Sequence, residues 1–472
     1  MIEGSSFRRD RAPSGPGRST QKANGRSLGV VLYEPSGRGG VCHYTYRLAE
    51  ALAAEGCRVT LVTTRDYELE HLPRRFRLRF LFKPSAVKRF LSSATSRVAR
   101  RRPSKTASGP PPAPSLRRPP ILVALRTLRV RLLQFLLALE LLWRRPDVVH
   151  FQLVSPARDL FLIRLLLRLG LPVVYTAHDV LPQDPRSAAR WSSHAKVYGL
   201  VDRLVVHAES DRREMVTLFG VDPRKISVIA HGSYDFLFPE GEIAREDARR
   251  RVGFPAEARI VLFFGLIKRY KGLEFLVEAF RRVRDRVPDA LLAVVGGLFR
   301  DADGYDFYRR LLDEICEDPR ILCVPKYVPL EDVGLYLSAA DVIVLPYTKI
   351  YQSGVLLAAY AAGRPVVATS TGGLPEVVEH GRSGLVVPPR DPEALASALV
   401  DLLEDLPRAV AMGKRALELG RTRYSWDGIA EQTANLYRAI LEERRAGGGQ
   451  TVSRVLPVLD PPPPERSGQV RR

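Results

Sequence analysis

Short apolar runs alternate with longer amphipathic segments along most of this 472-residue chain. The runs are rich in β-branched and other apolar residues and carry few charges, as strands buried on both faces of a parallel sheet do. In the first half of the chain, strands are predicted at 27–34, 57–64, 77–82, 147–151, 172–178, 203–208 and 226–230. Amphipathic periodicity predicts helices between them at 41–56, 121–143 and 157–170.

The second half of the chain repeats this alternation. Strands are predicted at 259–265, 290–297, 341–346 and 365–370, and helices at 272–283, 305–316, 353–363 and 374–381. Parallel strands that are joined through helices require right-handed crossovers. The pattern therefore predicts an α/β fold with two doubly wound, Rossmann-like domains that face each other across a cleft.

Composition sets the predicted domain bounds. Residues 1–26 and 446–472 are rich in Pro, Gly and Arg and are predicted to be disordered tails. Residues 27–235 are predicted to form an N-terminal domain and residues 236–423 a C-terminal domain. A final amphipathic helix at 424–445 is predicted to pack back across the hinge between them.

The net charge of +21 suggests a nucleic-acid-binding protein until the charges are located along the chain. The segment 83–145 carries fifteen Lys and Arg against one acidic residue, and residues 1–28 and 444–472 each have a net charge of +4. The rest of the chain is nearly neutral. No aromatic residue lies between Phe90 and Phe135 to stack on bases, which argues against a nucleic acid partner and leaves it as an alternative.

Cysteine usage and hydropathy bear on the compartment. The four cysteines are scattered and are predicted to be thiols, as in a reducing compartment; they are Cys42, Cys57, Cys316 and Cys323. The N-terminus has no apolar stretch typical of a signal peptide, and the longest apolar run, 132–143, is too short to span a bilayer. A cytoplasmic location is therefore predicted.

Ligands of doubly wound sheets bind beyond the carboxyl ends of the strands, so the loops at those ends are the candidate site. After the strand at 341–346, Ser353 is predicted to cap a helix that begins at Gly354. Free amides at a helix start bind anions without a cationic side chain. The turn at 370–373 offers the same arrangement, and two ordinary strand-to-helix turns are the alternative interpretation.

Two other loops carry candidate groups. The loop after the strand at 259–265 contains Lys268, Arg269 and Lys271, which suit a diphosphate; a solvated basic loop is the alternative. His178 ends another strand at the cleft rim, where it either binds a ligand or has a structural role. The stretch PSGRGG before the first helix lets backbone approach a ligand, although its spacing is not that of a dinucleotide fingerprint.

Several stretches taken together resemble one family. They are Gly39-Gly40 before the first helix, TAHDVLP, FFGLIKRYKG, AADVIVLPY, AYAAGRPVVAT and GGLPEVVEHGRSGLVVPP. In this order, the chain from Leu28 to Arg445 resembles the retaining GT-B glycosyltransferases of family 4. The resemblance implies a nucleotide-sugar donor held mainly by the C-terminal domain, an acceptor held by the N-terminal domain, no cofactor and no metal requirement.

The resemblance also implies roles for individual residues. Arg269 and Lys271 would stabilise the departing diphosphate, and His178 would contact the sugar. The implied donor-binding residues are Gly39, Gly40, Gln352, Ser353, Gly354, Val355, Tyr327, Val328, Gly372 and Gly373.

The chain departs from the family pattern at three positions. Two glutamates that the family commonly has are replaced by Ile350 and Ala358, and an arginine of the basic loop is replaced by Leu266. The residue that binds the ribose of the donor is therefore not assigned. A nucleotide-sugar epimerase and a non-catalytic sugar-nucleotide-binding relative stay as alternatives.

The predicted function is retaining transfer of a sugar to a saccharide or lipid-linked acceptor, in cell-surface polysaccharide or glycolipid biosynthesis. No pair of carboxylates on the cleft loops suits a double displacement, and the resemblance implies attack on the same face instead. The basic Pro/Arg-rich insertion at 84–119 and the helix after it suit peripheral contact with an anionic membrane at its inner face.

Overall fold

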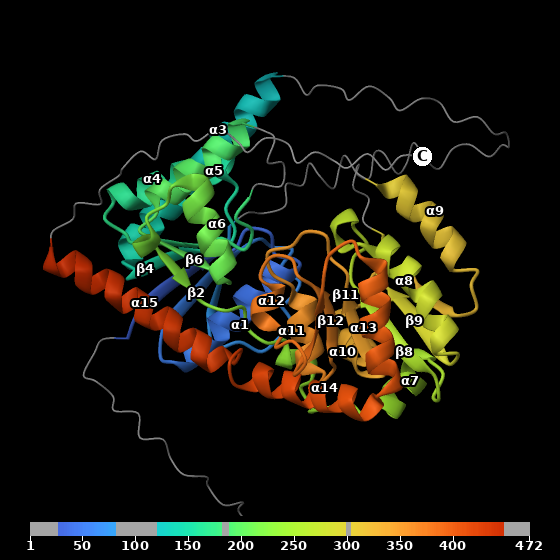
Figure 1. The fold of residues 1–472 in the computed structure, drawn as a ribbon. Helices are drawn as coiled ribbons and strands as arrows, with labels where there is room; N and C mark the ends of the chain where they lie inside the picture. The colour runs from blue at the N-terminus through green and yellow to red at the C-terminus, as the bar shows by residue number, and fades with distance from the viewer. Residues whose placement is uncertain (1–26, 82–119, 182–187, 299–303, 448–472) are drawn as a thin grey trace, which may run out of the picture.

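The computed structural model describes residues 27–81, 120–181, 188–298 and 304–447 (Figure 1). The predicted insertion at 84–119 and the tail at 1–26 lie outside these ranges, as does all but the start of the tail at 446–472. Within the described part, the chain forms two parallel sheets with helices on both faces, which confirms the predicted α/β architecture of two doubly wound domains.

The first sheet has the strand order β3-β2-β1-β4-β5-β6-β7, with every pair parallel. Its strands are β1 (Gly29–Tyr33), β2 (Arg58–Thr63), β3 (Arg77–Phe80), β4 (Val148–Phe151), β5 (Val173–Thr176), β6 (Arg203–Val206) and β7 (Ile226–Val228). Its helices are α1 (Gly40–Ala54), α3 (Pro120–Arg144), α4 (Pro156–Arg168), α5 (Ala188–Leu200) and α6 (Glu209–Phe219).

The second sheet repeats the topology, in the order β10-β9-β8-β11-β12-β13. Its strands are β8 (Arg259–Phe264), β9 (Ala290–Val295), β10 (Ile321–Val324), β11 (Val342–Leu345), β12 (Val366–Thr369) and β13 (Gly384–Val387). Its helices are α7 (Arg245–Val252), α8 (Leu273–Arg286), α9 (Tyr305–Ile315), α10 (Leu330–Ala339), α11 (Gly354–Ala361), α12 (Leu374–Val377), α13 (Pro392–Glu404) and α14 (Leu406–Arg421).

Helices on both faces explain why the strands are apolar throughout. Along β8, Val261 and Phe263 belong to one core cluster while Ile260 and Leu262 belong to the cluster on the opposite face. Each successive side chain is therefore buried against a different helical layer. This is the arrangement that continuous apolar runs predict.

Helix α15 (Trp426–Ala446) joins the two domains (Figure 1). It follows α14 of the second domain and packs against α1 of the first. Trp426 Nε1 donates to the carbonyl oxygen of Ser233 at 2.6 Å, and Tyr437 Oη lies 2.6 Å from His150 Nδ1. A Cβ at Gly232 would lie 2.3 Å from the Trp426 ring, so only glycine fits beneath this helix.

Some predicted elements are wrong or were missed. Helix α12 ends at Val377 rather than at 381, because the Glu379 carbonyl closes a turn with the amides of Arg382 and Ser383. The pattern did not predict the four-residue strands β10 and β13, which offer too few positions for a periodicity. Helices α5, α6, α7, α10, α13 and α14 were also not predicted.

Two of the four cysteines are not thiols. Cys316 and Cys323 form a disulfide that links the end of α9 to β10, which corrects the prediction, while Cys42 and Cys57 are free and buried. The two cysteines are seven positions apart in the sequence, so no CxxC spacing could indicate the bond. None of the described helices combines the length and apolar character needed to cross a membrane.

Candidate functional site

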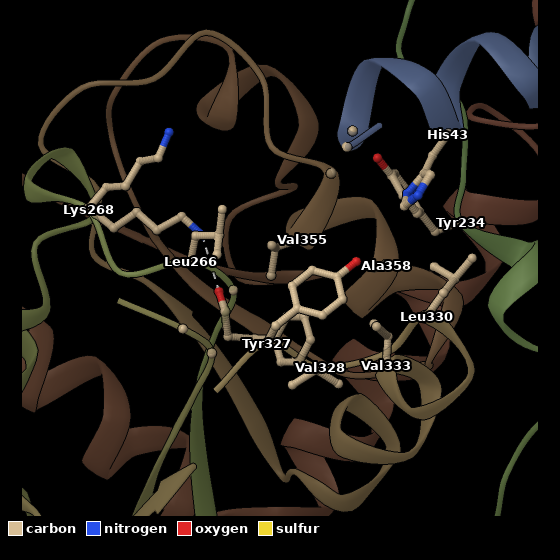
Figure 2. A pocket seen from close by; sticks show the side chains of 18 of the residues that line it. His43, Tyr234, Leu266, Lys268, Tyr327, Val328, Leu330, Val333, Val355 and Ala358 are labelled. Carbon is tan, nitrogen blue, oxygen red and sulfur yellow. Dashed lines mark hydrogen bonds between the residues drawn. The ribbon is translucent and has the colours of Figure 1, made fainter. Parts of the chain in front are cut away.

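A cavity of about 370 Å³ lies beyond the carboxyl ends of β1 and β8 (Figure 2). These are the strands at which the strand order of each sheet reverses. The start of α1 forms one wall, and the starts of α10 and α11 with the loops after β8, β9 and β10 form the others. Its lining includes Gly39, Gly40, His43, Tyr234, Leu266, Lys268, Lys271, Tyr327, Val328, Gly354, Val355 and Ala358.

Two helix starts meet in this cavity. Helix α11 begins at Gly354, and Ser353 accepts the amide hydrogen of Leu356 at 3.3 Å, which confirms the predicted cap. The first-turn amides at Gly354 and Val355 have no intrahelical acceptor and belong to residues that line the cavity. The hydroxyl of Tyr234 lies between α11 and α1, 2.4 Å from a Cβ built at Gly354 and 3.9 Å from one built at Gly40.

The basic loop presents two lysines to the cavity. Residues 269–271 form a single 3₁₀ turn, in which residues three apart lie on the same side. Lys268 and Lys271 therefore both line the cavity, whereas Arg269 is exposed, lies beside Gly304 and does not line it. Lys268, rather than Arg269, therefore lines the cavity together with Lys271, and Leu266 lines the wall beside it.

Lys271 is a buried cation. Its side chain is 7% exposed, and its Nζ donates to the carbonyl oxygen of Phe264 at 3.3 Å and lies 5.5 Å from the centre of the Tyr347 ring. Burial, with a smaller contribution from Lys268, lowers the pKa of Lys271 to about 8. An anion in the cavity would replace the hydration that this ammonium has lost.

The opposite part of the cavity is mostly apolar. Tyr327 is 68% exposed at its edge and Val328 is buried beneath it, as a flat ligand such as a base would require (Figure 2). Ala358 lines this part, so no carboxylate faces a ligand there from α11. Ile350 does not line the cavity, and its carbonyl packs against Gly372.

The turn at Gly372 and Gly373 has a packing role. Gly372 has φ of +52°, and a Cβ there would lie 1.8 Å from the Ile350 carbonyl oxygen. The Gly373 amide donates to the Tyr351 carbonyl at 3.0 Å, so it is not available to an anion, and α12 is only four residues long. The Gly373 amide is therefore bonded within the protein, and the glycines let this turn contact the loop that carries Gln352.

His178 lies beside the cavity rather than in its lining. Its Nδ1 lies 3.0 Å from His207 Nε2, and its ring packs edge-on against Tyr44 with 4.9 Å between ring centres. Burial raises the pKa of the neighbouring Asp179, and Lys268 opposes this rise from across the cleft. His178 is thus next to the basic loop of the other domain.

A polar pair on the first domain, His43 and Glu68, was not predicted from the sequence. His43 lines the cavity from the first turn of α1 (Figure 2). Its Nε2 lies 2.5 Å from Glu68 Oε1. Glu68 also accepts the amide hydrogen of Gly39 at 2.9 Å, so it positions the glycine turn as well. The helical phase after Gly40 could have indicated His43, but nothing local indicates Glu68.

Residues of the second domain bond directly to the first domain. Glu376 accepts the amide hydrogens of Glu209 and Ser210, both at 2.7 Å, and so caps α6 across the domain boundary. Tyr351 Oη accepts from the amide of Leu181 at 3.1 Å. The domains are closed on each other in this structure.

Two family models match the chain. Residues 38–233 match glycosyltransferase family 4, and residues 258–405 match glycosyl transferases group 1. A D-inositol 3-phosphate glycosyltransferase of Corynebacterium glutamicum is 31% identical over 64% of this chain and 74% of its own length. That of Corynebacterium efficiens is 32% identical over 64% of this chain and 73% of its own.

Solved structures share the fold. Anabaena HepE, in complex with UDP and glucose, has a TM-score of 0.63 at 17% identity and covers 87% of this chain and 100% of its own. Sucrose-phosphate synthase from Thermosynechococcus elongatus has a TM-score of 0.63 at 23% identity, covering 89% of this chain and 100% of its own.

Proposed function

The chain belongs to glycosyltransferase family 4 and is a glycosyltransferase with the GT-B fold; from this premise we propose that it transfers a sugar, with retention, from a nucleotide-diphosphate sugar to a saccharide or lipid-linked acceptor. The observation that carries the proposal is the cavity where Lys268, Lys271 and the start of α11 converge. These groups supply the positive charge that a diphosphate needs.

In the proposed reaction, the bond between the anomeric carbon and the diphosphate oxygen breaks, and the acceptor oxygen bonds to that carbon on the same face. The acceptor proton passes to the departing phosphate oxygen, so no protein base is needed. Negative charge grows on the diphosphate as the bond breaks, and a buried ammonium stabilises this state more than the ground state. Lys271 has this role, and Lys268 supports it from a more exposed position.

The base of the donor is proposed to lie against Tyr327 and Val328, and the sugar toward the first domain near His178. UDP and glucose in HepE support a donor of this kind. The acceptor would enter from the first domain. Because relatives are named for D-inositol 3-phosphate, this polyol phosphate joins simple saccharides and lipid-linked sugars in the acceptor panel.

We also propose peripheral contact with an anionic membrane, supported by the outward face of α3. Helix α3 lies at the edge of the first domain (Figure 1), and seven of the thirteen exposed large hydrophobic residues in the described part of the chain lie on it. They are Leu128, Leu132, Phe135, Leu136, Leu139, Leu142 and Trp143. Arg129, Arg144 and Arg145 lie on the same helix or directly after it, as in surface-bound amphipathic helices.

The membrane contact is tested by co-sedimentation with phosphatidylcholine vesicles with and without phosphatidylglycerol. Deleting residues 84–119, or replacing Leu132, Phe135 and Leu139 together by Gln, should each reduce binding to the anionic vesicles. Val410→Gln, a 48% exposed apolar residue on α14, is the matched control and should bind as the wild type does. Equal binding by all variants would refute the contact.

The transfer itself is tested in two steps. Thermal-shift measurements with UDP-, GDP- and ADP-sugars should first identify the donor, and transfer to the acceptor panel is then followed by mass spectrometry. Anomeric coupling constants in the product establish retention. A donor that is altered without any acceptor would indicate the alternative epimerase, and binding without turnover would indicate a non-catalytic relative.

A further inference from the structure

Helix α11 offers no polar side chain to the ribose of a nucleotide in this cavity. A ribose lies between its base and its diphosphate, and its hydroxyls need hydrogen-bond partners when they are buried. With the base against Tyr327 and the diphosphate at Lys271 and the start of α11, the ribose lies between these two ends of the cavity. The residue that α11 presents there is Ala358, which has no hydrogen-bonding group in its side chain.

His43 faces this region from the other domain (Figure 2). Gly40 and His43 are three apart on one face of α1, and Gly354 and Ala358 are four apart on one face of α11. The hydroxyl of Tyr234 lies 3.9 Å from a Cβ built at Gly40 and is closer still to one built at Gly354. The two faces therefore meet across this hydroxyl, with His43 one turn along α1 and Ala358 one turn along α11. All five residues line the cavity.

Glu68 holds one nitrogen of the His43 ring, whose side chain is 14% exposed. Its Oε1 lies 2.5 Å from His43 Nε2. Burial opposes ionisation of Glu68, but the bonds from His43 and from the Gly39 amide lower its pKa, so the carboxylate is charged and can only accept. His43 Nε2 therefore carries a proton that points at Glu68, and the other ring nitrogen, Nδ1, is left for a ligand.

The pair of His43 and Glu68 belongs to the nucleoside end of the cavity. Burial raises the pKa of Tyr327, and the charges of Glu68 and Glu331 add to this rise. Glu68 is therefore close enough to the proposed base site on the second domain to act on its tyrosine across the cleft.

We propose that His43 binds a ribose hydroxyl of the donor through Nδ1, in the region where α11 presents only Ala358, and that Glu68 is the positioning residue that orients the ring. The inference rests on the proposed function. A ribose hydroxyl can donate to Nδ1 of a neutral imidazole and can accept from Nδ1 of a protonated one. The contact is therefore available in both protonation states of His43.

This contact makes the nucleotide a bridge between the domains. His43 lies on the first domain, whereas Tyr327 and Lys271 lie on the second. The ribose contact therefore exists only while the domains are closed on each other, as the bonds of Glu376 to α6 and of Tyr351 to Leu181 hold them. The donor is a ribonucleotide, and loss of one ribose hydroxyl weakens its binding.

The test compares nucleoside diphosphates that differ in one ribose hydroxyl. Isothermal titration calorimetry of the full-length protein first measures the affinities for UDP, GDP and ADP. The one that binds most tightly is then compared with its 2′-deoxy and 3′-deoxy forms. The wild type should bind at least one deoxy form roughly tenfold more weakly than the ribonucleotide, the scale of one hydrogen bond.

Variants assign this discrimination to His43. His43→Phe keeps an aromatic ring, so it should bind the ribonucleotide roughly tenfold more weakly and no longer distinguish that deoxy form. His43→Asn, whose amide group takes the place of Nδ1, should recover the discrimination. Glu68→Ala should reduce it, and Glu68→Gln, which still accepts from Nε2, should recover it.

A neighbouring ring provides a matched control. Phe236 packs edge-on against His43 with 6.0 Å between ring centres and carries no polar group. Phe236→Leu disturbs the same packing without removing Nδ1, so this variant should still distinguish the ribonucleotide from the deoxy form.

The outcomes separate the two proposals. Equal binding of the ribonucleotide and both deoxy forms by the wild type would overturn the ribose contact without any variant. A folded His43→Phe that keeps the discrimination would overturn it as well, and in both cases binding of the nucleotide still supports the donor site. If the wild type binds none of UDP, GDP and ADP, the proposed function fails and the ribose contact fails with it.

Discussion

Removing the ammonium group of Lys271 should abolish most of the transfer activity. Lys271 is 7% exposed and lines the cavity from the loop after β8, so solvent screens its attraction for a departing diphosphate only weakly. Loss of one such preorganised donor costs roughly a hundredfold in kcat, or about 2.7 kcal/mol of transition-state stabilisation. Lys271→Ala tests the whole side chain, and Lys271→Met keeps its stem and removes only the charge.

The pH dependence gives an independent measure of the same group. Because burial lowers the pKa of Lys271 to about 8, kcat/KM of the free enzyme should fall as the pH rises through about 8. A bound diphosphate favours the charged form, so kcat should persist to higher pH than kcat/KM.

Steady-state transfer assays across this range, with the donor found in the thermal-shift screen, provide the measurement. Arg281→Ala is the control, because this cation is 57% exposed on α8 and forms an ion pair with the surface residue Glu314. Wild-type kcat in a folded Lys271→Met, or a kcat/KM that is flat through about pH 8, would refute the assigned role.

Further predictions concern the basic loop, the contacts between the domains, the ionisation of Asp211 and the independence of transfer from a metal. Arg269→Ala should reduce kcat far less than Lys268→Ala, because only Lys268 lines the cavity; the opposite order in the same assay would show that the loop turns differently in the enzyme. Trp426→Ala should lower the free energy of unfolding by about 3–5 kcal/mol in urea titrations, and a loss below about 1 kcal/mol would contradict its place in the joint between domains. Burial, with Glu214 and Glu376, raises the pKa of Asp211 to about 7, so its ionisation destabilises the fold increasingly as the pH rises from about 4 to 7. Asp211→Asn should therefore raise Tm more at about pH 8 than at about pH 4, and an equal gain at both would argue against this. Because the proposed diphosphate site takes its positive charge from lysines and amides, EDTA should leave transfer intact, and activity restored only by Mg²⁺ would contradict this proposal.

The local sequence pattern was sufficient to predict the two sheets and one feature of the site, the helix cap at Ser353. The apolar runs had to be strands buried on both faces, because no half-exposed strand could carry Ile260 through Phe263 without a polar position. The cap at Ser353 was also predictable from the local sequence, because a cap depends only on its own residue and on the first turn of the helix.

Contacts that no local sequence pattern marks could not be predicted in this way. The Cys316–Cys323 disulfide, the Glu376 cap on α6 and the pairing of His43 with Glu68 each join groups whose local sequence has no distinctive signal. The glycines of the turn at Gly372 and Gly373 could be read from the sequence, but the bond of the Gly373 amide to the Tyr351 carbonyl could not.

The order of apolar and polar residues thus determined that this chain folds into two parallel, helix-covered sheets, because a strand that is buried on both faces needs an apolar residue at each position. Tertiary structure alone decided which side chains of the loops after those strands line the cavity. A 3₁₀ turn directs Lys268 and Lys271 inward and Arg269 outward, and packing of β5 against β6 brings His207 to His178. The first depends on the backbone direction of the loop and the second on neighbours far apart in the chain, and residue types by themselves encode neither.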